Sequence, residues 1–334
     1  MACRSGADGF ERQSADGGER AEVEFGREWS VNNRRVVLAG GSGFLGRALA
    51  KELILRNYEV VVLTRSPRKQ TDGIKDVLWD GKNSSEWIQM LDGAEAVVNL
   101  AGRNIKCRYT PENLRELTSS RVNSVLAIAA EIGRVARPPR VWVQAGAIGF
   151  YGDAKDSWCD ENSPAGSDTL SGICQPWEAV FNSAPAPWTR RAMLRIGFVL
   201  GRDGGALPVL AGLAKWFLGG TAGNGGQFIS WIHVGDLIWM FIEAIERNEL
   251  TGTFNAVGPN PVTNREFMRE LRRALHRPWS PPAPEWVVKR GARLMGAEPS
   301  LALAGCRVAP KRFLEAGFKF QFPELPGALK NLFG

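Results

Sequence analysis

The sequence predicts an α/β fold: a Rossmann-type doubly wound parallel sheet, followed by a smaller C-terminal appendage on the substrate side. First, strand-like and helix-like apolar patterns alternate from residue 34 to residue 275. Second, a glycine-rich turn at residues 40–46 joins a short apolar strand directly to an amphipathic helix. Third, prolines cluster after residue 277, where the alternation ends and short helical patterns begin.

These patterns divide the chain into three parts. Residues 1–33 are rich in Gly, Ser, Glu and Arg, and we expect them to form a disordered tail. Residues 34–277 form the predicted nucleotide-binding domain, and residues 278–334 form a small, mostly helical C-terminal domain. The expected strands are 34–38, 59–64, 77–79, 96–100, 140–144, 192–200, 228–234 and 253–257. The expected helices are 44–53, 85–91, 111–135, 171–183, 207–218, 236–246, 264–275, 286–295, 311–316 and 325–332.

The composition excludes several classes of function. The 334 residues carry a net charge of +7, but basic residues are scattered among acidic ones, so we expect no nucleic-acid partner. No apolar run approaches the length of a membrane span. The five cysteines form no Cys-x-x-Cys pair and the chain has two histidines, which indicates a reduced, cytoplasmic protein without a metal site.

The glycine-rich turn predicts a site for the phosphates of a dinucleotide. Gly40 allows a sharp turn, Gly43 lets backbone N–H groups approach a phosphate, and Gly46 lets the helix pack closely on the strand. The first turn of the helix adds unpaired N–H donors and a positive dipole end. The predicted cofactor-binding residues in this segment are Gly40, Gly41, Ser42, Gly43, Phe44, Leu45 and Gly46. A second segment of small residues follows the strand at residues 96–100, and it adds Leu100, Ala101 and Gly102.

Arg65 indicates which dinucleotide is bound. It follows the second strand, about twenty residues after the glycines, where NAD-binding units usually carry Asp or Glu. An arginine fork suits the 2′-phosphate of NADP, which a carboxylate would repel. The sequence therefore predicts NADP rather than NAD, and the alternative is a solvated arginine at a strand end.

Further motifs occur at residues 98–102 (Val-Asn-Leu-Ala-Gly), 147–152 (Ala-Ile-Gly-Phe-Tyr-Gly), 195–201 (Arg-Ile-Gly-Phe-Val-Leu-Gly) and 255–262 (Asn-Ala-Val-Gly-Pro-Asn-Pro-Val). Together with the glycine-rich turn they resemble those of atypical short-chain dehydrogenases/reductases of the extended, epimerase-like kind. More narrowly, the chain is similar to the epimerase family protein group, which carries a C-terminal domain of unknown function.

The resemblance implies an NADP-binding fold with a sugar-nucleotide-epimerase ancestry. It also implies cofactor contacts at Arg121, Ala145 and Gly146. Because extended relatives often pair through two helices, it implies a monomer or a homodimer that acts on a small-molecule substrate.

The chain departs from the wider superfamily at the catalytic residues. Those enzymes use a Tyr as acid/base, a Lys one helical turn later that lowers its pKa, and a Ser that orients the carbonyl. Here Leu170 stands at the place of the Tyr, Cys174 at that of the Lys, and Gly146 at that of the Ser. Tyr151 and Lys155 have the right spacing, but they follow a strand directly, and a loop does not impose one-turn geometry.

The remaining candidates for acid/base chemistry are few, and each has a structural alternative. They are Cys174, Glu178, His233 and Tyr151. A buried thiol, a salt bridge or helix cap, and a hydrogen-bonded core histidine are the alternatives for the first three. The residues predicted to line the substrate pocket are Gln227, Ser230 and Trp231.

Two functions fit these observations. The first is an NADP-dependent, epimerase-like oxidoreductase that acts on an unknown small substrate, sugar-nucleotide-like or carbonyl. The second is a non-catalytic NADP(H)-binding redox sensor or scaffold, which the missing Tyr, Lys and Ser favour.

Overall fold

The computed structural model describes residues 34–68, 73–83 and 86–334, and these form one compact unit. The tail predicted at residues 1–33 lies outside the described residues.

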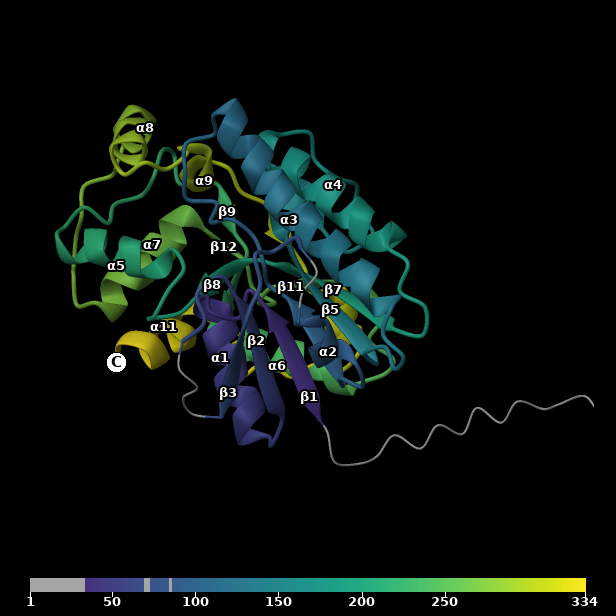
Figure 1. The fold of residues 1–334 in the computed structure, drawn as a ribbon. Helices are drawn as coiled ribbons and strands as arrows, with labels where there is room; N and C mark the ends of the chain where they lie inside the picture. The colour runs from purple at the N-terminus through teal and green to yellow at the C-terminus, as the bar shows by residue number, and fades with distance from the viewer. Residues whose placement is uncertain (1–33, 69–72, 84–85) are drawn as a thin grey trace, which may run out of the picture. The chain divides into compact units, whose positions relative to one another are not determined.

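A seven-stranded parallel sheet lies at the centre, in the strand order β11-β7-β5-β4-β1-β2-β3 (Figure 1). Its strands are β1 (Arg35–Ala39), β2 (Glu59–Thr64), β3 (Ile74–Leu78), β4 (Ala96–Asn99), β5 (Val141–Ala147), β7 (Arg190–Ile196) and β11 (Gly252–Ala256). The order reverses at β1, because β2 and β3 lie on one side of it and the later strands on the other. The predicted doubly wound sheet is therefore confirmed.

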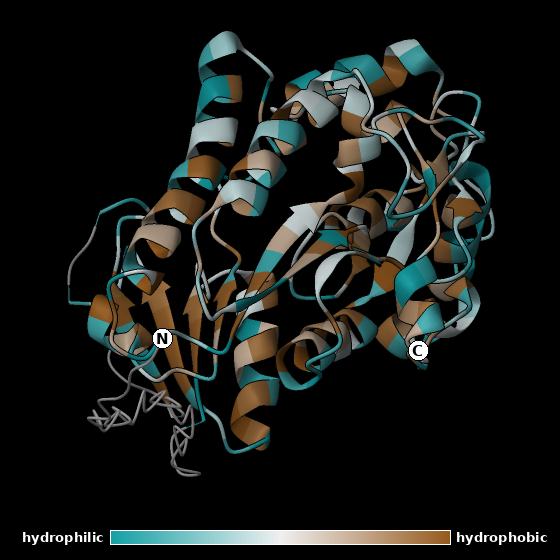
Figure 2. Cartoon of the chain, turned by 90° about the vertical axis from the view of Figure 1, so that its right-hand side faces the viewer, coloured by the Kyte–Doolittle hydropathy of each residue, from teal (hydrophilic) through white to brown (hydrophobic). Residues whose placement is uncertain are grey.

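Helices cover both faces of this sheet. Apolar side chains of α1, α6 and α10 pack on one face, and those of α2, α3 and α4 pack on the other. These helices are α1 (Phe44–Leu55), α2 (Ile88–Leu91), α3 (Pro111–Ile132), α4 (Thr169–Ser183), α6 (Val234–Glu246) and α10 (Lys311–Glu315). Because both faces are covered, the strands read as continuous apolar runs, which are brown in Figure 2.

The second half of the chain departs from its predicted strands. The strand expected at residues 192–200 breaks at Gly197, where a Cβ would overlap the carbonyl oxygen of Ser230. Beyond the break, β8 (Phe198–Leu200) leaves the central sheet and pairs with β10 (Trp231–His233). The strand expected at residues 228–234 is likewise divided, since β9 (Phe228–Ile229) pairs with β12 (Val262–Thr263) instead.

The C-terminal region shares its core with the rest of the chain. Its strand β13 pairs with β6, and Phe313 of α10 packs against Phe254 of β11. Helix α11 packs in one apolar cluster with α5 and α7. The boundary predicted at residue 278 therefore does not separate two cores. Besides α10, the C-terminal elements are α8 (Glu285–Leu294), α9 (Ser300–Leu303), β13 (Arg307–Val308) and α11 (Leu325–Phe333). The elements that β13 and α11 contact are β6 (Trp158–Cys159), α5 (Leu207–Lys215) and α7 (Asn264–Ala274).

The packing of Gly46 predicts a stability effect. A Cβ at Gly46 would overlap the backbone of Gly41, which has no room to move away. Gly46→Ala should therefore lower the free energy of unfolding by about 1–3 kcal/mol. The control is Gly212→Ala in α5, where a Cβ meets no atom within 4 Å; it should raise stability by about 0.5–1 kcal/mol. Urea unfolding measures both, and a Gly46→Ala protein as stable as the wild type contradicts the prediction.

Candidate functional site

The glycine-rich turn is held by close backbone contacts at the carboxyl edge of the sheet. Gly40 has a φ of +74° and its N–H donates to the carbonyl of Leu63 at 3.0 Å. A Cβ at Gly40 would lie 2.8 Å from the Cα of Ala101, so the turn sits directly against the end of β4. Only a residue without a side chain fits this approach at positive φ.

Gly43 differs from its neighbours because the protein's own packing does not require a glycine there. A Cβ at Gly43 would meet only the Gly40 carbonyl oxygen, at an ordinary 3.7 Å. Gly43 is exposed and is the N-cap of α1, whose first N–H groups receive no side-chain cap. An exposed, uncapped helix N-terminus beside a glycine cradle fits an anionic phosphate.

Phe44 and Leu45 carry the turn into α1. The Phe44 ring lies so close to the loop after β8 that a Cβ at Gly204 would be 2.5 Å from it. Leu45 packs on the core of the sheet. The side chains of both residues therefore hold the turn in place.

Arg65 lies beside this turn, as the sequence predicts. Thr64, at the end of β2, donates from its hydroxyl to that of Ser42 at 3.3 Å and so ties the strand end to the turn. Arg65 is exposed, and among the described residues it forms no hydrogen bond or ion pair. Its guanidinium is therefore available to an anion.

A buried hydrogen-bond network fixes the ends of β4 and β5. The side-chain amide of Asn99 donates to the Ser124 hydroxyl and to Gln144 Oε1, both at 3.0 Å. Asn99 Oδ1 accepts the N–H of Ala101, and Gln144 donates to the carbonyl of Ala145 at 2.9 Å. All three polar side chains are fully buried, so this network positions the backbone at both strand ends.

Arg121 braces the loop after β4 from α3. Its guanidinium donates to the carbonyl of Arg103 at 3.0 Å and lies 5.3 Å from the Trp177 ring centroid. A Cβ at Gly102 would lie 3.2 Å from Arg121 Cγ. The structure thus places Arg121, Gly102 and Ala101 together, and Leu100 continues the backbone ladder by donating to Ala39.

Tyr151 is bonded within the protein and does not pair with Lys155. It ends the 3-10 helix η1 (Ile148–Tyr151), and its hydroxyl accepts from Arg195 at 2.8 Å. Asn255 Oδ1 and the Asp160 carbonyl lie 2.7 and 2.8 Å from the same hydroxyl. Burial raises the pKa of Tyr151 to about 12, and Arg195 opposes that shift. Lys155 lies exposed in the following loop.

Glu178 forms a buried ion pair with Arg195. Three contacts of 2.8–3.2 Å join the carboxylate to the guanidinium, which also lies 3.7 Å over the Phe150 ring. Burial raises the pKa of Glu178, and Arg195 opposes that shift. The pair joins α4 to β7, which matches the salt-bridge alternative for Glu178.

Cys174 and Leu170 both face the loop after β5. A Cβ at Gly149 would lie 3.4 Å from Leu170 Cβ and 3.5 Å from Cys174 Sγ. Burial, with the Glu178 charge adding to it, raises the pKa of Cys174 to about 12, so the thiol stays protonated at neutral pH. A Cβ at Gly146 would crowd Met193 at 3.2 Å.

His233 caps a helix. Its Nδ1 accepts the N–H of Gly235 at 3.0 Å, at the start of α6, and its ring lies 4.0 Å from the Phe322 ring. Burial lowers the pKa of His233 to about 4, and the nearby Asn331 opposes the shift. The imidazole is therefore neutral at pH 7, with its acceptor nitrogen already used.

The three predicted substrate residues are bonded to backbone groups. Ser230 donates to the Cys306 carbonyl at 2.7 Å and accepts the Val308 N–H at 2.9 Å. Trp231 is fully buried and donates to the Asn260 carbonyl at 2.9 Å. Gln227 is half-buried and donates to the Ala302 carbonyl at 2.8 Å. This segment therefore fastens the C-terminal region onto the site.

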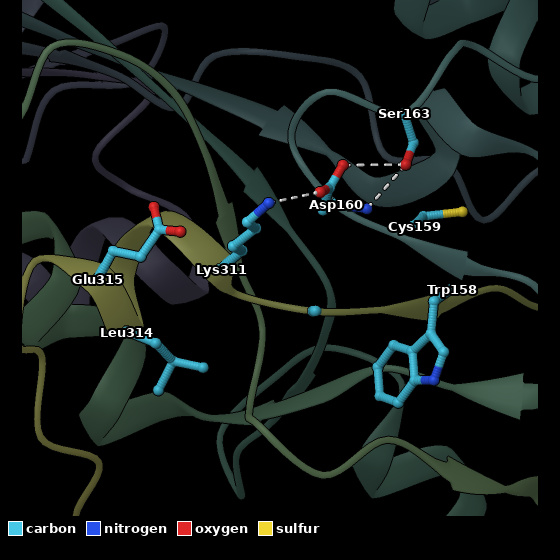
Figure 3. A pocket seen from close by; sticks show the side chains of 8 residues that line it. Trp158, Cys159, Asp160, Ser163, Lys311, Leu314 and Glu315 are labelled. Atoms are coloured by element: carbon cyan, nitrogen blue, oxygen red, sulfur yellow. Dashed lines mark hydrogen bonds and ion pairs between the residues drawn. The ribbon is translucent and has the colours of Figure 1, made fainter.

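Two cavities in the described part of the chain lie apart from the glycine-rich turn. One, of about 440 Å³, lies between β6 and α10, and contains the Lys311–Asp160 ion pair at 3.3 Å (Figure 3). The other, of about 280 Å³, lies between Tyr109 and Glu298. Within the described ranges, no cluster of three His, Cys, Asp or Glu has metal-binding geometry, and no helix is long and apolar enough to cross a membrane.

Several residues that the sequence analysis did not name have a buried polar atom without a hydrogen-bond partner, and two of them are considered below. Tyr109 is one: its hydroxyl is buried without a hydrogen bond, and its ionisable neighbours include Arg121 and Cys174. Since the chain has three tyrosines, an inventory of them by strand end would have found it. Arg307 is the other: its buried Nε has no partner. No sequence signal marks it.

Comparison with known proteins agrees with this fold. Residues 36–176 match the NAD dependent epimerase/dehydratase family, and residues 283–332 match a domain of unknown function, DUF1731. The fold and the glycine-rich turn therefore define a nucleotide-binding protein of the short-chain dehydrogenase/reductase type.

The similar proteins identify the narrower family. A chloroplastic homologue of epimerase family protein SDR39U1 from Arabidopsis thaliana is 37% identical, over 89% of this chain and 86% of that protein. Human SDR39U1 is 36% identical, over 89% and 99%. This chain belongs to the epimerase family proteins that carry the DUF1731 domain.

Solved structures support the same placement. Human SDR39U1, isoform 2, solved with NADPH, has a TM-score of 0.80 at 35% identity, covering 89% of this chain and 98% of that one. A nucleoside-diphosphate sugar epimerase from Corynebacterium glutamicum has a TM-score of 0.72 at 31% identity, covering 90% and 58%.

His233 predicts a pH dependence of stability. Its pKa is about 4 in the folded state and about 6.5 when unfolded, so between these values only the unfolded chain takes up the proton. The free energy of unfolding should therefore decrease as the pH is lowered, and this group should account for about 2 kcal/mol of the decrease between pH 7 and pH 5. His233→Asn keeps a capping oxygen and should remove that part of the slope in urea unfolding.

The control is His276→Asn, which removes the other histidine from an exposed position. That variant should keep the wild-type slope. Parallel slopes for the wild type and His233→Asn contradict the prediction.

Proposed function

We propose that this protein binds NADPH and reduces a carbonyl group of a small, sugar-nucleotide-like or other carbonyl substrate. The observation that carries this proposal is the glycine-rich turn at the reversal point of the sheet. There the packing against Ala101 requires a glycine at position 40, whereas Gly43 and the uncapped start of α1 are exposed. We propose further that the protein acts in the cytoplasm. We expect it to be a monomer or a homodimer.

Groups in and beside the turn suit the two separate phosphate groups of NADPH, the diphosphate and the 2′-phosphate. The N–H groups at the start of α1 would hold the diphosphate, and Arg65 the 2′-phosphate. The human relative solved with NADPH supports this choice of nucleotide. Ala101 and Ala145, whose backbones the Asn99 network fixes, would border the nicotinamide half.

Bound NADPH supplies a hydride to a carbonyl carbon, and the carbonyl oxygen then needs one proton to give the alcohol. We assign that proton to the Tyr109 hydroxyl. It has no hydrogen bond of its own, and the cationic Arg121 opposes the rise in pKa that burial imposes on the phenol. A protonated phenol at neutral pH is suited to donate rather than to accept.

The non-catalytic alternative also has support. Tyr151, Glu178 and His233 each hold a bond within the protein, and the Cys174 thiol is protonated. A protein with no acid/base residue would bind NADPH and transmit its redox state without turnover.

Arg65 should decide between the two dinucleotides. Arg65→Gln removes a charge-assisted hydrogen bond to the 2′-phosphate, so NADPH should bind about 10- to 100-fold more weakly, with NADH unaffected. Titration calorimetry measures both affinities. The control is Arg68→Gln, three residues on, since Arg68 bonds to Asp76 at 3.4 Å. An equal loss for NADH in Arg65→Gln contradicts the assignment.

Hydride transfer tests the function directly. The purified protein is mixed with stereospecifically deuterated NADPH and a cell metabolite extract, and mass spectrometry follows the label. We expect deuterium in one reduced metabolite, and about 100-fold slower transfer by Tyr109→Phe with NADPH affinity retained. No transfer by a sample shown to bind NADPH favours the sensor or scaffold instead.

A further inference from the structure

Arg307 lies between aromatic rings from two distant parts of the chain. Its guanidinium carbon is 4.1 Å from the ring centroid of Trp158 on β6 and 4.8 Å from that of Phe228 on β9. Trp158 remains 51% exposed. The rings hold the guanidinium by cation–π contacts, which supply no hydrogen-bond acceptor in its plane.

The hydrogen-bonding edge of Arg307 is unused. Its Nε is buried without a partner, and among the described residues the guanidinium forms no hydrogen bond or ion pair. The carboxylates that follow Trp158 make their contacts elsewhere: Asp160 pairs with Lys311 at 3.3 Å, and Glu161 Oε1 accepts the N–H of Asn255 at 3.0 Å, while Glu161 Oε2 is buried without a partner. An unpaired, partly buried cation is a costly arrangement unless a ligand completes it.

The backbone around Arg307 is fixed against the predicted site. The Ser230 hydroxyl bonds to the residues on both sides of it, the Cys306 carbonyl and the Val308 N–H. Gly305, which precedes Cys306, donates its N–H to the carboxylate of Asp153 at 3.2 Å, in the loop that follows η1. The Cys306 thiol lies 3.9 Å from the Ile148 carbonyl, directly after β5. Arg307 is thus attached to the end of the strand that carries Ala145 and Gly146.

We propose that Arg307, held between Trp158 and Phe228, binds an oxyanion of the substrate, a phosphate or a carboxylate. This inference rests on the proposed function, and it restricts the substrate to carbonyl compounds that carry such a group. The planar fork of Arg307 offers two parallel N–H donors to two oxygens of one anion. Because Arg65 is assigned to the cofactor, the two arginines serve different molecules.

The test measures the NMR signal of the Arg307 guanidinium directly. Protein labelled with ¹⁵N-arginine is saturated with NADPH and titrated with inorganic phosphate, and in a second arm with malonate, while ¹H–¹⁵N spectra follow the Nε–H signals. The Arg307 signal is assigned from its loss in Arg307→Lys. We expect a saturable shift of that signal with at least one anion, and the arm that saturates at the lower concentration names the oxyanion.

Variants decide whether the shift belongs to this site. Arg307→Gln should weaken anion binding at least tenfold, followed by tryptophan fluorescence, whereas Lys311→Gln should leave it unchanged. Lys311 is the matched control, since it is a nearby cation that already pairs with Asp160, apart from Trp158 (Figure 3). If Arg307→Gln does not fold, Arg307→Lys keeps the charge but not the fork, and should also bind more weakly.

The outcomes separate this inference from the proposed function. An unshifted Arg307 signal in both arms, or full anion binding by Arg307→Gln, overturns the inference. Loss of NADPH binding or of hydride transfer overturns the proposed function instead, because the anion titration reads Arg307 without turnover.

Discussion

The site depends on a backbone contact between two strand ends. Gly40 and Ala101 approach so closely that no side chain fits between the end of β1 and the segment after β4. The same turn donates to Leu63, and therefore brings β2 and Arg65 alongside. Gly46 then packs against Gly41 and sets the direction in which α1 leaves the turn. Three glycines thus fix three strand ends and one helix axis relative to one another.

The C-terminal region is held by a different kind of contact, because the last elements of the chain pack on elements from its middle part. Phe313 and Phe318 belong to the apolar cluster of the central sheet, so the last residues complete a core that the first half begins. Ser230 holds the segment 306–308 through two hydrogen bonds to its backbone. The C-terminal domain of unknown function therefore shares the framework of the fold, and it contributes Arg307, whose side chain is half-buried.

Local patterns were sufficient for the sheet and for the cofactor side. Continuous apolar runs predicted β1, β2 and β4 within a residue or so, because a strand covered on both faces has no polar positions. Pro111 predicted the start of α3, since a proline at the first helical position is a local signal. The break at Gly197 was not predictable, because its cause is the carbonyl of Ser230, far along the chain.

The catalytic candidates were harder for the same reason. Tyr151 has its partners on β7 and β11, and Asn255 is 104 residues away, so no spacing in the sequence indicates that the hydroxyl is bonded. The sequence predicts a substrate pocket at Gln227, Ser230 and Trp231, but in the fold their polar groups bind backbone carbonyls. The sequence shows which side chains carry groups capable of acid/base chemistry. Only the fold shows which of those groups already have hydrogen-bond partners within the protein.

This distinction indicates where function lies. A protein that buries a polar atom normally supplies its hydrogen bond, because an unpaired buried group costs about 1–3 kcal/mol. Glu178 and Tyr151 follow that rule, since their buried oxygens bond to Arg195 and both residues are parts of the framework. The Tyr109 hydroxyl and Arg307 Nε do not follow it. One is a neutral donor near Arg121 and the other belongs to a cation in contact with two rings, and these are the two side chains to which the proposals above assign a ligand group.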